Sequence, residues 1–362
     1  MIAEGRLLLQ IGWNGKRVTA ASVRSTRPVD ACRVLEGKAV EDALRLIPLL
    51  FSVCARAQSV AASVACEAAA GATASLPLRR QRERGIAAEC LQEYAWRQLI
   101  DLPGLLGESP RPHELGQLRM GLARAGGDAD WNAVATFAEE LLAERIFGVR
   151  PEIWLAWSAA RLEAWIDAGG QPAARMLRRM RRLRLGAEGR RLPWLAAADL
   201  RDGIGPLVAG TGWTAAPTWQ GRAAETGAWA RQACHARVAS EGAGASARVL
   251  ARLVELTELP RQMRMPRAVG VRCAALGAGR GIAAVETARG TLVHDVVLER
   301  GRIARYRIAA PTEWNFHPLG AFPRGMLGRT ARDAGEVREA AALLAHALDP
   351  CVAYDVEVRH HA

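Results

Sequence analysis

The sequence is poor in lysine and in aromatic residues, and it has no long uninterrupted apolar run. Only Lys16 and Lys38 are lysines among the 49 basic residues, so arginine carries nearly all of the positive charge. Aromatic residues make up 5% of the chain, with 11 Trp among them. Because no stretch of about 18 apolar residues occurs and the apolar run near the N-terminus is short, the sequence predicts neither a membrane span nor a signal peptide.

The cysteines do not follow the pattern of a secreted, disulfide-bonded protein. There are seven of them, an odd number, and they are irregularly spaced along a chain of 362 residues. We therefore expect a cytoplasmic protein, in which thiols stay reduced and can bind metal. The seven are Cys32, Cys54, Cys66, Cys90, Cys234, Cys273 and Cys351.

The chain is strongly basic, with a formal net charge of +12 and a pI of about 10.3. This charge predicts attraction to an acidic protein partner, whereas nucleic-acid binding is not expected, because net charge alone carries no base recognition. Residues 175–191 contain eight arginines. A solvated helix face is the simpler interpretation of this segment, and a docking surface for an acidic partner is the alternative.

Length and periodicity predict a helix-rich α+β protein in which residues 1–362 form one domain. Half of the residues are hydrophobic, which is enough for a sizeable core. A β-hairpin is expected within residues 1–25, where Asn14-Gly15 has the composition of a type I′ turn. Residues 40–260 are expected to be mainly helical.

Two features are expected to interrupt the helical part, and a second β-rich region is expected after it. Pro48 marks a break or a new helix start, and residues 71–84 resemble a loop. Residues 286–362 are expected to contain a second hairpin, which turns at Arg300-Gly301, then a final helix and a C-terminal Asp-Pro-Cys segment.

Three distant segments hold the residues that point to chemistry. Cys54 precedes a helix of small residues, and a helix N-terminus stabilises a thiolate and makes it a better metal ligand. Arg289 and Thr312 are hydrogen-bond donors suited to an anionic ligand, and we expect them to face each other across the second hairpin. Cys351 follows the final helix. Taken singly, Cys54 reads as a buried core residue and Cys351 as part of a frayed tail.

Taken together, the three segments resemble the signatures of the nickel–iron hydrogenase large subunit, in the same order along the chain. Residues 48–71 resemble that family's Cys-Gly-x-Cys-x-x-x-His helix, and residues 286–320 resemble its Pro-Arg-Gly-x-Leu-x-His segment followed by Pro-Thr-x-Trp-Asn. The C-terminal segment resembles its Asp-Pro-Cys-x-x-Cys-x-x-His. The resemblance covers residues 1–101 and 286–354 and implies the fold of that subunit, whereas residues 104–280 match none of its signatures.

The chain departs from this family at the nickel ligands. Four thiolates hold nickel in the family, but here Phe51 and Tyr354 stand where two of the cysteines belong. Cys54 and Cys351 remain, and a tetrathiolate nickel site cannot be built from two soft ligands. The sequence therefore predicts a metal site made by Cys54 and Cys351, with no nickel.

The groups around the metals are kept. By the resemblance, Arg289 and Thr312 match donors to the cyanide ligands on iron, and Asp349 matches a charged group beside the metals. Glu4 matches a proton-relay acid, and Asp101 matches an acid after the second long helix. This pattern is similar to the HupK/HoxV type of hydrogenase accessory protein.

That resemblance implies a maturation scaffold or chaperone rather than an enzyme. Its expected cargo is the iron–cyanide–carbonyl fragment, Fe(CN)2(CO), held transiently. Its expected partners are other hydrogenase maturation proteins and the precursor of the hydrogenase large subunit.

Two other functions stay open. One is a reduced hydrogenase or another redox catalyst, which needs replacement ligands such as His360, His361 or Glu357. The histidines of the family's first and last motifs are themselves replaced, by Gln58 and Glu357. The other is a metal-free interaction protein that binds only other assembly factors.

Overall fold

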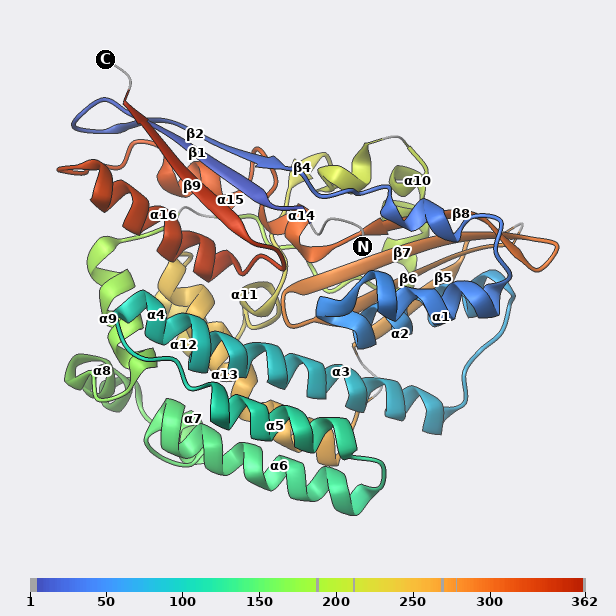
Figure 1. Cartoon of the computed structure of the whole chain (residues 1–362), viewed down its shortest axis with the longest axis horizontal. Coiled ribbons are helices and arrows are strands. Elements are labelled where there is room, and N and C mark those ends of the chain that lie inside the picture. Colours follow the sequence, from blue (N-terminus) through green and yellow to red (C-terminus); the bar gives the residue numbers. More distant parts are fainter. Residues whose placement is uncertain (1–4, 187–188, 211, 268–269, 278, 361–362) are drawn as a thin grey trace.

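The computed structural model describes residues 5–186, 189–210, 212–267, 270–277 and 279–360. Long helices form one layer of the molecule, and the two larger β-sheets lie on one side of it (Figure 1). This is the helix-rich α+β architecture predicted from the sequence. The strands are β1 Leu7–Trp13, β2 Val18–Ser25, β3 Thr218–Trp219, β4 Arg222–Ala223, β5 Val271–Ala275, β6 Arg280–Thr287, β7 Gly290–Glu299, β8 Arg302–Ala309 and β9 Tyr354–His360.

The helices vary from single turns to long rods, and three of the short elements are π-helical. The α-helices are α1 Val40–Leu50, α2 Ala55–Ala69, α3 Leu76–Trp96, α4 Leu102–Leu106, α5 Pro112–Arg124, α6 Asp128–Leu142, α7 Pro151–Ala156, α8 Ala159–Ala168, α9 Pro172–Leu183, α10 Gly205–Val208, α11 Ala228–Arg231, α12 Ala236–Glu241, α13 Ala245–Arg264, α14 Pro311–Asn315, α15 Ala321–Met326 and α16 Ala334–Leu348. The π-helical turns are η3 Arg97–Asp101, η4 Ala143–Phe147 and η5 Asp199–Ile204, and the 3-10 turns are η1 Ala31–Leu35, η2 Ser52–Cys54 and η6 Trp213–Ala215.

The two ends of the chain share one three-stranded sheet, in the order β2-β1-β9. β1 pairs antiparallel with β2, as predicted, and β9 pairs in parallel with β1 on its other side (Figure 1). The predicted type I′ turn is wrong, because Gly15 has a positive φ but Asn14 does not. The Asn14 side chain instead accepts hydrogen bonds from the backbone N–H groups of Lys16 and Arg17. β9 was not predicted, and its pairing anchors the C-terminal segment.

The second hairpin belongs to a four-stranded antiparallel sheet, in the order β5-β6-β7-β8. β7 and β8 are the predicted hairpin, and Arg300 and Gly301 both have positive φ, as a type I′ turn requires. β5 and β6 were not predicted, because the glycines in residues 277–281 interrupt the alternation that marks a strand. The sheet therefore begins before residue 286, where the second signature segment starts.

The Ala-rich stretch after the first hairpin folds as two helices, α1 and α2. The predicted break at Pro48 is wrong, because Pro48 lies inside α1 and the helix ends before Phe51. α2 packs so closely on β6 that a Cβ atom on Gly281 would lie 2.2 Å from the carbonyl oxygen of Ala65. The small residues thus permit close helix–sheet packing, and this packing fixes Cys54 at the front of α2.

The helical layer is more continuous than predicted. The predicted loop over residues 71–84 is wrong from Leu76 onward, because α3 begins there and continues through η3 into α4. α13 is 20 residues long and packs against α3, α6, α9 and α16. Its Arg252 side chain lies 3.3 Å from the carboxylate of Asp349.

The first part of the Arg-rich segment lies on α9. This helix buries Met176, Leu177 and Met180 on its inner face. The interpretation of this segment as a freely solvated helix face is wrong for three arginines of α9, because each of them forms an ion pair with a neighbouring element. The pairs are Arg175–Glu108, Arg179–Glu339, Arg181–Glu163 and Arg181–Glu241. The docking role stays a prediction.

The main hydrophobic core takes residues from both ends of the chain and from the helical layer. It extends from Leu7 on β1 to Leu348 at the end of α16. A smaller core around Trp314 lies against the four-stranded sheet. Among the described residues, no single helix is long and apolar enough to cross a membrane. α1 and the segment Ser52–Ala69 are long and apolar enough only when they are taken together, and the two are bent by 96° relative to each other.

Candidate functional site

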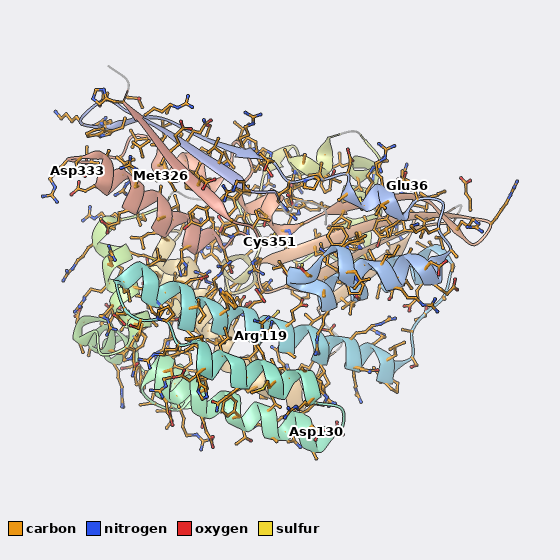
Figure 2. All side chains as sticks on the ribbon, viewed as in Figure 1. Glu36, Arg119, Asp130, Met326, Asp333 and Cys351 are labelled. Carbon is orange, nitrogen blue, oxygen red and sulfur yellow. The ribbon has the colours of Figure 1, made fainter. Side chains whose placement is uncertain are left out.

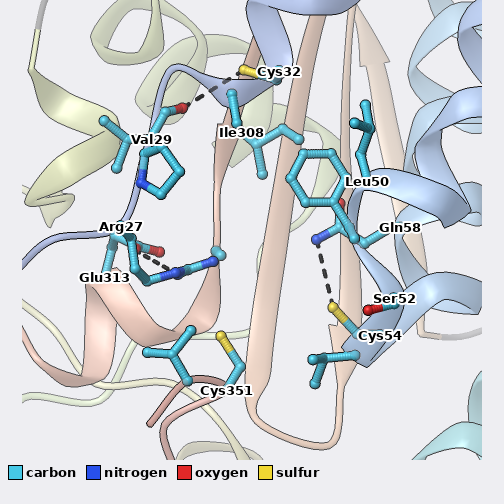
Figure 3. Close-up of a pocket in the computed structure, with 16 residues that line it drawn as sticks. Arg27, Val29, Cys32, Leu50, Ser52, Cys54, Gln58, Ile308, Glu313 and Cys351 are labelled. Atoms are coloured by element: carbon cyan, nitrogen blue, oxygen red, sulfur yellow. Dashed lines mark hydrogen bonds and ion pairs between the residues drawn. The ribbon is translucent and has the colours of Figure 1, made fainter. Parts of the chain in front are cut away.

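Cys54 and Cys351 line the same cavity, although they lie near opposite ends of the chain. Cys54 directly precedes α2, and Cys351 follows α16 near the centre of the molecule (Figure 2). The cavity has a volume of about 110 Å³. A single buried water needs about 10–15 Å³, so the cavity has room for a compact ligand. Figure 3 shows the two thiols entering it from different segments.

The expectation that the helix N-terminus lowers the pKa of Cys54 is wrong for the metal-free protein. Burial, together with the charges of Glu89 and Cys351, raises the pKa of the Cys54 thiol to about 12. The carboxylate of Glu89, on α3, accepts hydrogen bonds from the backbone N–H groups of Arg56 and Ala57 at 2.8 and 3.2 Å. Glu89 thus occupies the first-turn N–H groups of α2, so they are not free to stabilise a thiolate.

A chain of hydrogen bonds orients the Gln58 amide, which donates a hydrogen bond to Cys54. The Gln58 amide donates to Cys54 Sγ over 3.5 Å, and its carbonyl oxygen accepts from His294 Nε2 over 2.8 Å. His294 Nδ1 in turn accepts from the Tyr306 hydroxyl at 2.8 Å. Burial lowers the pKa of His294 to about 3, so the ring is neutral and this arrangement needs only one tautomer. Gln58, which replaces the family's histidine, therefore presents an N–H group to the sulfur.

Thr312 and Cys351 are bonded to each other. The Thr312 hydroxyl donates to Cys351 Sγ at 2.9 Å, and its oxygen accepts from the Cys351 backbone N–H at 3.1 Å. The Asn315 amide, on the same short helix α14, donates to the carbonyl oxygens of Arg289 and Leu348 at 3.0 and 3.3 Å. α14 thus joins the end of α16 to the β6–β7 turn and holds Cys351 at the cavity.

Asp349 lies among three arginines. Its carboxylate is 2.6 Å from Arg97 Nε, 3.3 Å from Arg252 Nη1 and 3.6 Å from Arg289 Nε. Burial alone would raise the pKa of Asp349, but the three guanidinium groups hold it well below its usual range. Arg97 also donates to the carbonyl oxygen of Pro350 at 2.7 Å. This cluster fixes the backbone just before Cys351, where Asp349 has a φ of 57°.

Arg289 is buried, and its side chain faces acids rather than Thr312. Its Nη2 donates to Glu93 at 2.7 Å, and it lines a small cavity next to the one that holds the thiols. Arg289 and Thr312 lie at the same end of the β7–β8 hairpin, but the expectation that they face each other is wrong. Gly290, after Arg289, has a φ of 131°, and a Cβ atom there would lie 2.3 Å from Thr226 Cγ2. Only glycine fits this turn without strain.

The two acids predicted around the metals have different outcomes. Asp101, at the end of η3, pairs with Arg97 and so connects to Asp349 through one guanidinium. Asp101 is not among the residues that line the cavity. Glu4 lies outside the described residues. Arg97, which sequence reasoning missed, is therefore the group that joins Asp101 to the site.

The residues that differ from the hydrogenase signatures lie in different parts of the structure. Phe51 lines the cavity. Tyr354 begins β9, and its hydroxyl lies 3.4 Å from the carbonyl oxygen of Ala342 on α16. Glu357 pairs with Gln10 and Arg359, away from the thiols.

The replacement ligands considered for a catalyst are not at the cavity. Glu357 and His360 lie along β9, and the His360 ring packs against Trp13 with the ring centroids 5.7 Å apart. Neither residue is among those that line the cavity. His361 lies outside the described residues.

Two further charged residues line the cavity, and the sequence analysis missed both. Arg27 Nη1 donates to Glu313 Oε1 at 2.6 Å, and the side chains are 18% and 5% exposed. Glu313 occupies the variable position of the Pro-Thr-x-Trp-Asn segment, so the sequence held a weak signal for it. Arg27 lies outside the three signature segments, which are residues 48–71, residues 286–320 and the C-terminal Asp-Pro-Cys segment.

The site offers two thiols as its metal-binding groups. Within the described ranges, no group of three or more His, Cys, Asp or Glu side chains is placed to hold a metal ion. Cys32 also lines the cavity, but its Sγ points to the carbonyl oxygens of Val29 and Tyr306. An iron centre that supplies its own remaining ligands fits this donor set, and a tetrathiolate nickel centre does not.

Comparison with known proteins places the chain among hydrogenase-related sequences. A sequence model of the nickel-dependent hydrogenase family matches residues 272–357. The hydrogenase expression/formation protein HupK of Bradyrhizobium diazoefficiens is 32% identical over 94% of this chain and 92% of its own length. HupK of Azotobacter vinelandii is 33% identical over 98% and 99%. HoxV of Cupriavidus necator, also a hydrogenase expression/formation protein, is 30% identical over 92% of each chain.

Solved structures with the same fold are hydrogenases. The Ni-Fe-Se hydrogenase from D. vulgaris Hildenborough aligns over 94% of each chain with a TM-score of 0.56 and 17% sequence identity. This likeness confirms the predicted large-subunit type of fold, including residues 104–280, which the sequence signatures left unmatched. The near full-length relatives are more specific. By their identity and coverage, the chain belongs to the family of hydrogenase expression/formation proteins that includes HupK and HoxV.

Proposed function

We propose that this hydrogenase maturation protein is a scaffold that holds the iron–cyanide–carbonyl fragment, Fe(CN)2(CO), before a nickel–iron active site is completed. One observation carries the proposal: Cys54 and Cys351 line one cavity, and Phe51 lines it where a nickel ligand would stand. Two thiolates suffice for an iron that brings diatomic ligands with it. They do not suffice for nickel.

The surroundings of the thiols favour an anionic cargo. An iron fragment that carries two cyanides and accepts two thiolates is negatively charged, and burying it needs cations and N–H or O–H donors. Arg289 lies beside Asp349 and near Cys351, and Gln58 donates to Cys54. These groups would offset the charge of the cargo without acting as ligands to the metal.

From this scaffold the fragment would pass to the precursor of the hydrogenase large subunit. Other maturation proteins would supply the fragment. Both thiols must stay reduced for this role, which favours the cytoplasm as the compartment.

Metal analysis and infrared spectroscopy of the anaerobically purified protein test the proposal. The protein should be produced in a host with the complete hydrogenase maturation machinery. We expect iron without nickel, together with cyanide and carbon monoxide stretching bands. Iron and nickel together, with hydrogen turnover, would show a reduced hydrogenase instead. Protein without iron in repeated preparations would show a metal-free interaction protein.

The isolated protein should neither oxidise nor evolve hydrogen. The expectation follows from Phe51 and Tyr354, which stand where two nickel thiolates are needed. Hydrogen-dependent reduction of a viologen dye measures it directly. Robust turnover by protein with one nickel per chain would overturn the expectation.

Replacing Arg289 should weaken retention of the iron fragment. Arg289 lies near Cys351 without lining the thiol cavity, and a buried cation beside an anionic cargo is worth about 1.5–3 kcal/mol, so Arg289→Met should lower retention by about ten- to a hundred-fold. Thr312→Val should have a smaller effect, about 1 kcal/mol. Infrared spectra of the purified variants measure both the amount of cargo and the cyanide frequencies.

The ion pairs of Arg289 suggest a different role for this residue, which is to stabilise the fold and not to bind the cargo. If Arg289 serves only Glu93 and Asp349, Arg289→Met should lower thermal stability and leave the cyanide bands unmoved. Arg302→Met is a suitable control, because Arg302 is exposed and its guanidinium donates to the carbonyl oxygen of Gly37. A folded Arg289→Met protein with full iron occupancy and unchanged bands would exclude a role in binding the cargo.

A further inference from the structure

Arg27 enters the thiol cavity from the loop after β2. Its backbone packs against the segment just before β1, where a Cβ atom on Gly5 would lie 2.6 Å from the Arg27 Cα, and the neighbouring Thr26 N–H donates to the carbonyl oxygen of Arg6. The side chain lines the same cavity as Cys54 and Cys351, and Figure 3 shows the guanidinium reaching into it. The position of this charge is therefore set by packing and not by a flexible surface loop.

The guanidinium of Arg27 lies within electrostatic reach of both thiols. Burial opposes its charge, but Cys351, Glu313 and Cys54 together raise the pKa of Arg27 above its ordinary value. Among the residues that the structure describes, Glu313 is the only hydrogen-bond partner of this guanidinium, and it contacts Nη1 alone. The other N–H groups of Arg27 are left to a ligand in the cavity.

We infer that Arg27 is the residue that binds an anionic ligand in this cavity, in competition with Glu313. This inference rests on the proposed function for the identity of the cargo, an iron complex whose cyanide nitrogens accept hydrogen bonds. It adds a binding residue outside the three signature segments. Arg27 donates to the acceptor atoms of the cargo, and its charge partly neutralises the two thiolates.

Glu313 has the opposite effect on the same ligand. Its carboxylate is almost fully buried, lines the cavity and carries the same sign of charge as the cargo. Without cargo it pairs with Arg27, which keeps the cation in place and leaves neither charge alone in a dry environment. With cargo present it must share Arg27, so it weakens binding. Removing the charge of Glu313 should therefore strengthen binding of an anion, whereas removing Arg27 should weaken it.

The test compares Arg27→Met and Glu313→Gln in protein purified anaerobically from the maturation-competent host. Retention of iron and of the cyanide bands should fall about ten-fold or more in Arg27→Met and rise in Glu313→Gln. The double variant Arg27→Met/Glu313→Gln removes both buried charges, so it should fold even if Arg27→Met does not, and it should bind weakly. Arg33→Met is the control, because Arg33 is 62% exposed and pairs at 3.7 Å with Glu36.

A second probe, thiocyanate, makes the result independent of the iron fragment. Cargo-free protein is titrated with sodium thiocyanate, a linear anion with its own infrared band. Binding that is lost in Arg27→Met and strengthened in Glu313→Gln supports the inference even if no preparation contains iron, in which case the proposed cargo is wrong. Iron retention and thiocyanate binding that are equal in wild type, Arg27→Met and the double variant would overturn the inference and leave the proposed scaffold intact. A parallel loss of binding in Arg27→Met and Glu313→Gln would show a purely structural ion pair, and this also overturns it.

Discussion

Replacing either Cys54 or Cys351 with Ala should reduce hydrogenase activity in the producing cell to the level of a strain that lacks this protein. Both residues line the cavity, and under the proposed function their sulfurs hold the iron, which one thiolate alone cannot hold against competing ligands in the cell. Hydrogen uptake by whole cells that express each variant measures the effect. Immunoblotting must show that the variants accumulate normally.

The other cysteines provide matched controls. Cys234 and Cys273 are exposed and lie away from the cavity, so their replacement by Ala should leave hydrogenase activity unchanged. Cys66 and Cys90 are buried in the core, and their replacement should cost about 1 kcal/mol of stability without loss of maturation.

Cys32 is the most informative control, because it lines the same cavity. Its Sγ lies 3.4 Å from the carbonyl oxygen of Tyr306, so Cys32→Ala should spare maturation. Loss of maturation in Cys32→Ala would enlarge the ligand set to three thiols. Normal maturation by Cys54→Ala and Cys351→Ala would exclude thiolate binding of any cargo.

Asp349→Asn should lower the free energy of unfolding by about 3–5 kcal/mol, because it leaves three buried or nearly buried guanidinium groups without their shared anion. Asp349 is 7% exposed in its side chain, and Arg97, Arg252 and Arg289 are 18%, 5% and 8% exposed. The amide of Asn keeps the shape and removes only the charge. Unfolding in guanidinium chloride, followed by circular dichroism, measures the loss.

Asp355→Asn is the matched control for charge removal. Asp355 pairs with Arg6 at 2.9 Å, but the two side chains are 47% and 55% exposed, so the change should cost at most about 1 kcal/mol. Equal stability of Asp349→Asn and Asp355→Asn would show that the buried cluster is not held together by Asp349.

Low pH should remove the stabilisation that the Asp349 carboxylate provides. The pKa of Asp349 in the folded protein lies well below the value of about 3.9 in an unfolded chain. Its stabilisation is therefore fully present above about pH 4 and is lost as the pH falls toward the folded-state pKa. The difference in stability between wild type and Asp349→Asn should shrink as the pH falls below 4. A constant difference across this range would contradict the assignment of the stabilisation to the charge.

Local structure was predictable wherever one periodicity was uninterrupted. The alternation of Leu7, Leu9 and Ile11 predicted β1, and the Arg300-Gly301 pair predicted the β7–β8 turn. β5 and β6 were missed because glycines lie between the two strands and at Gly281, and the start of α3 was missed because its first turns are rich in arginine. Burial of β6 against α2, which a local pattern does not contain, decided the structure of that strand. The first turns of α3 are exposed, so burial does not explain them.

The sequence by itself determined the family, the two cysteines and their placement at the ends of two helices, because these depend on residue types at short, fixed spacings. The tertiary structure alone decided the charges around them. Glu89 takes the N–H groups of α2, Arg97 joins Asp101 to Asp349, and Arg27 reaches the cavity from the first hairpin. Apart from Arg97–Asp101, which lies within η3, each of these contacts joins elements that lie far apart in the chain. Electrostatic interactions act over distance in space, so the acid–base properties of Cys54 followed from the path of the backbone and not from its neighbours in sequence.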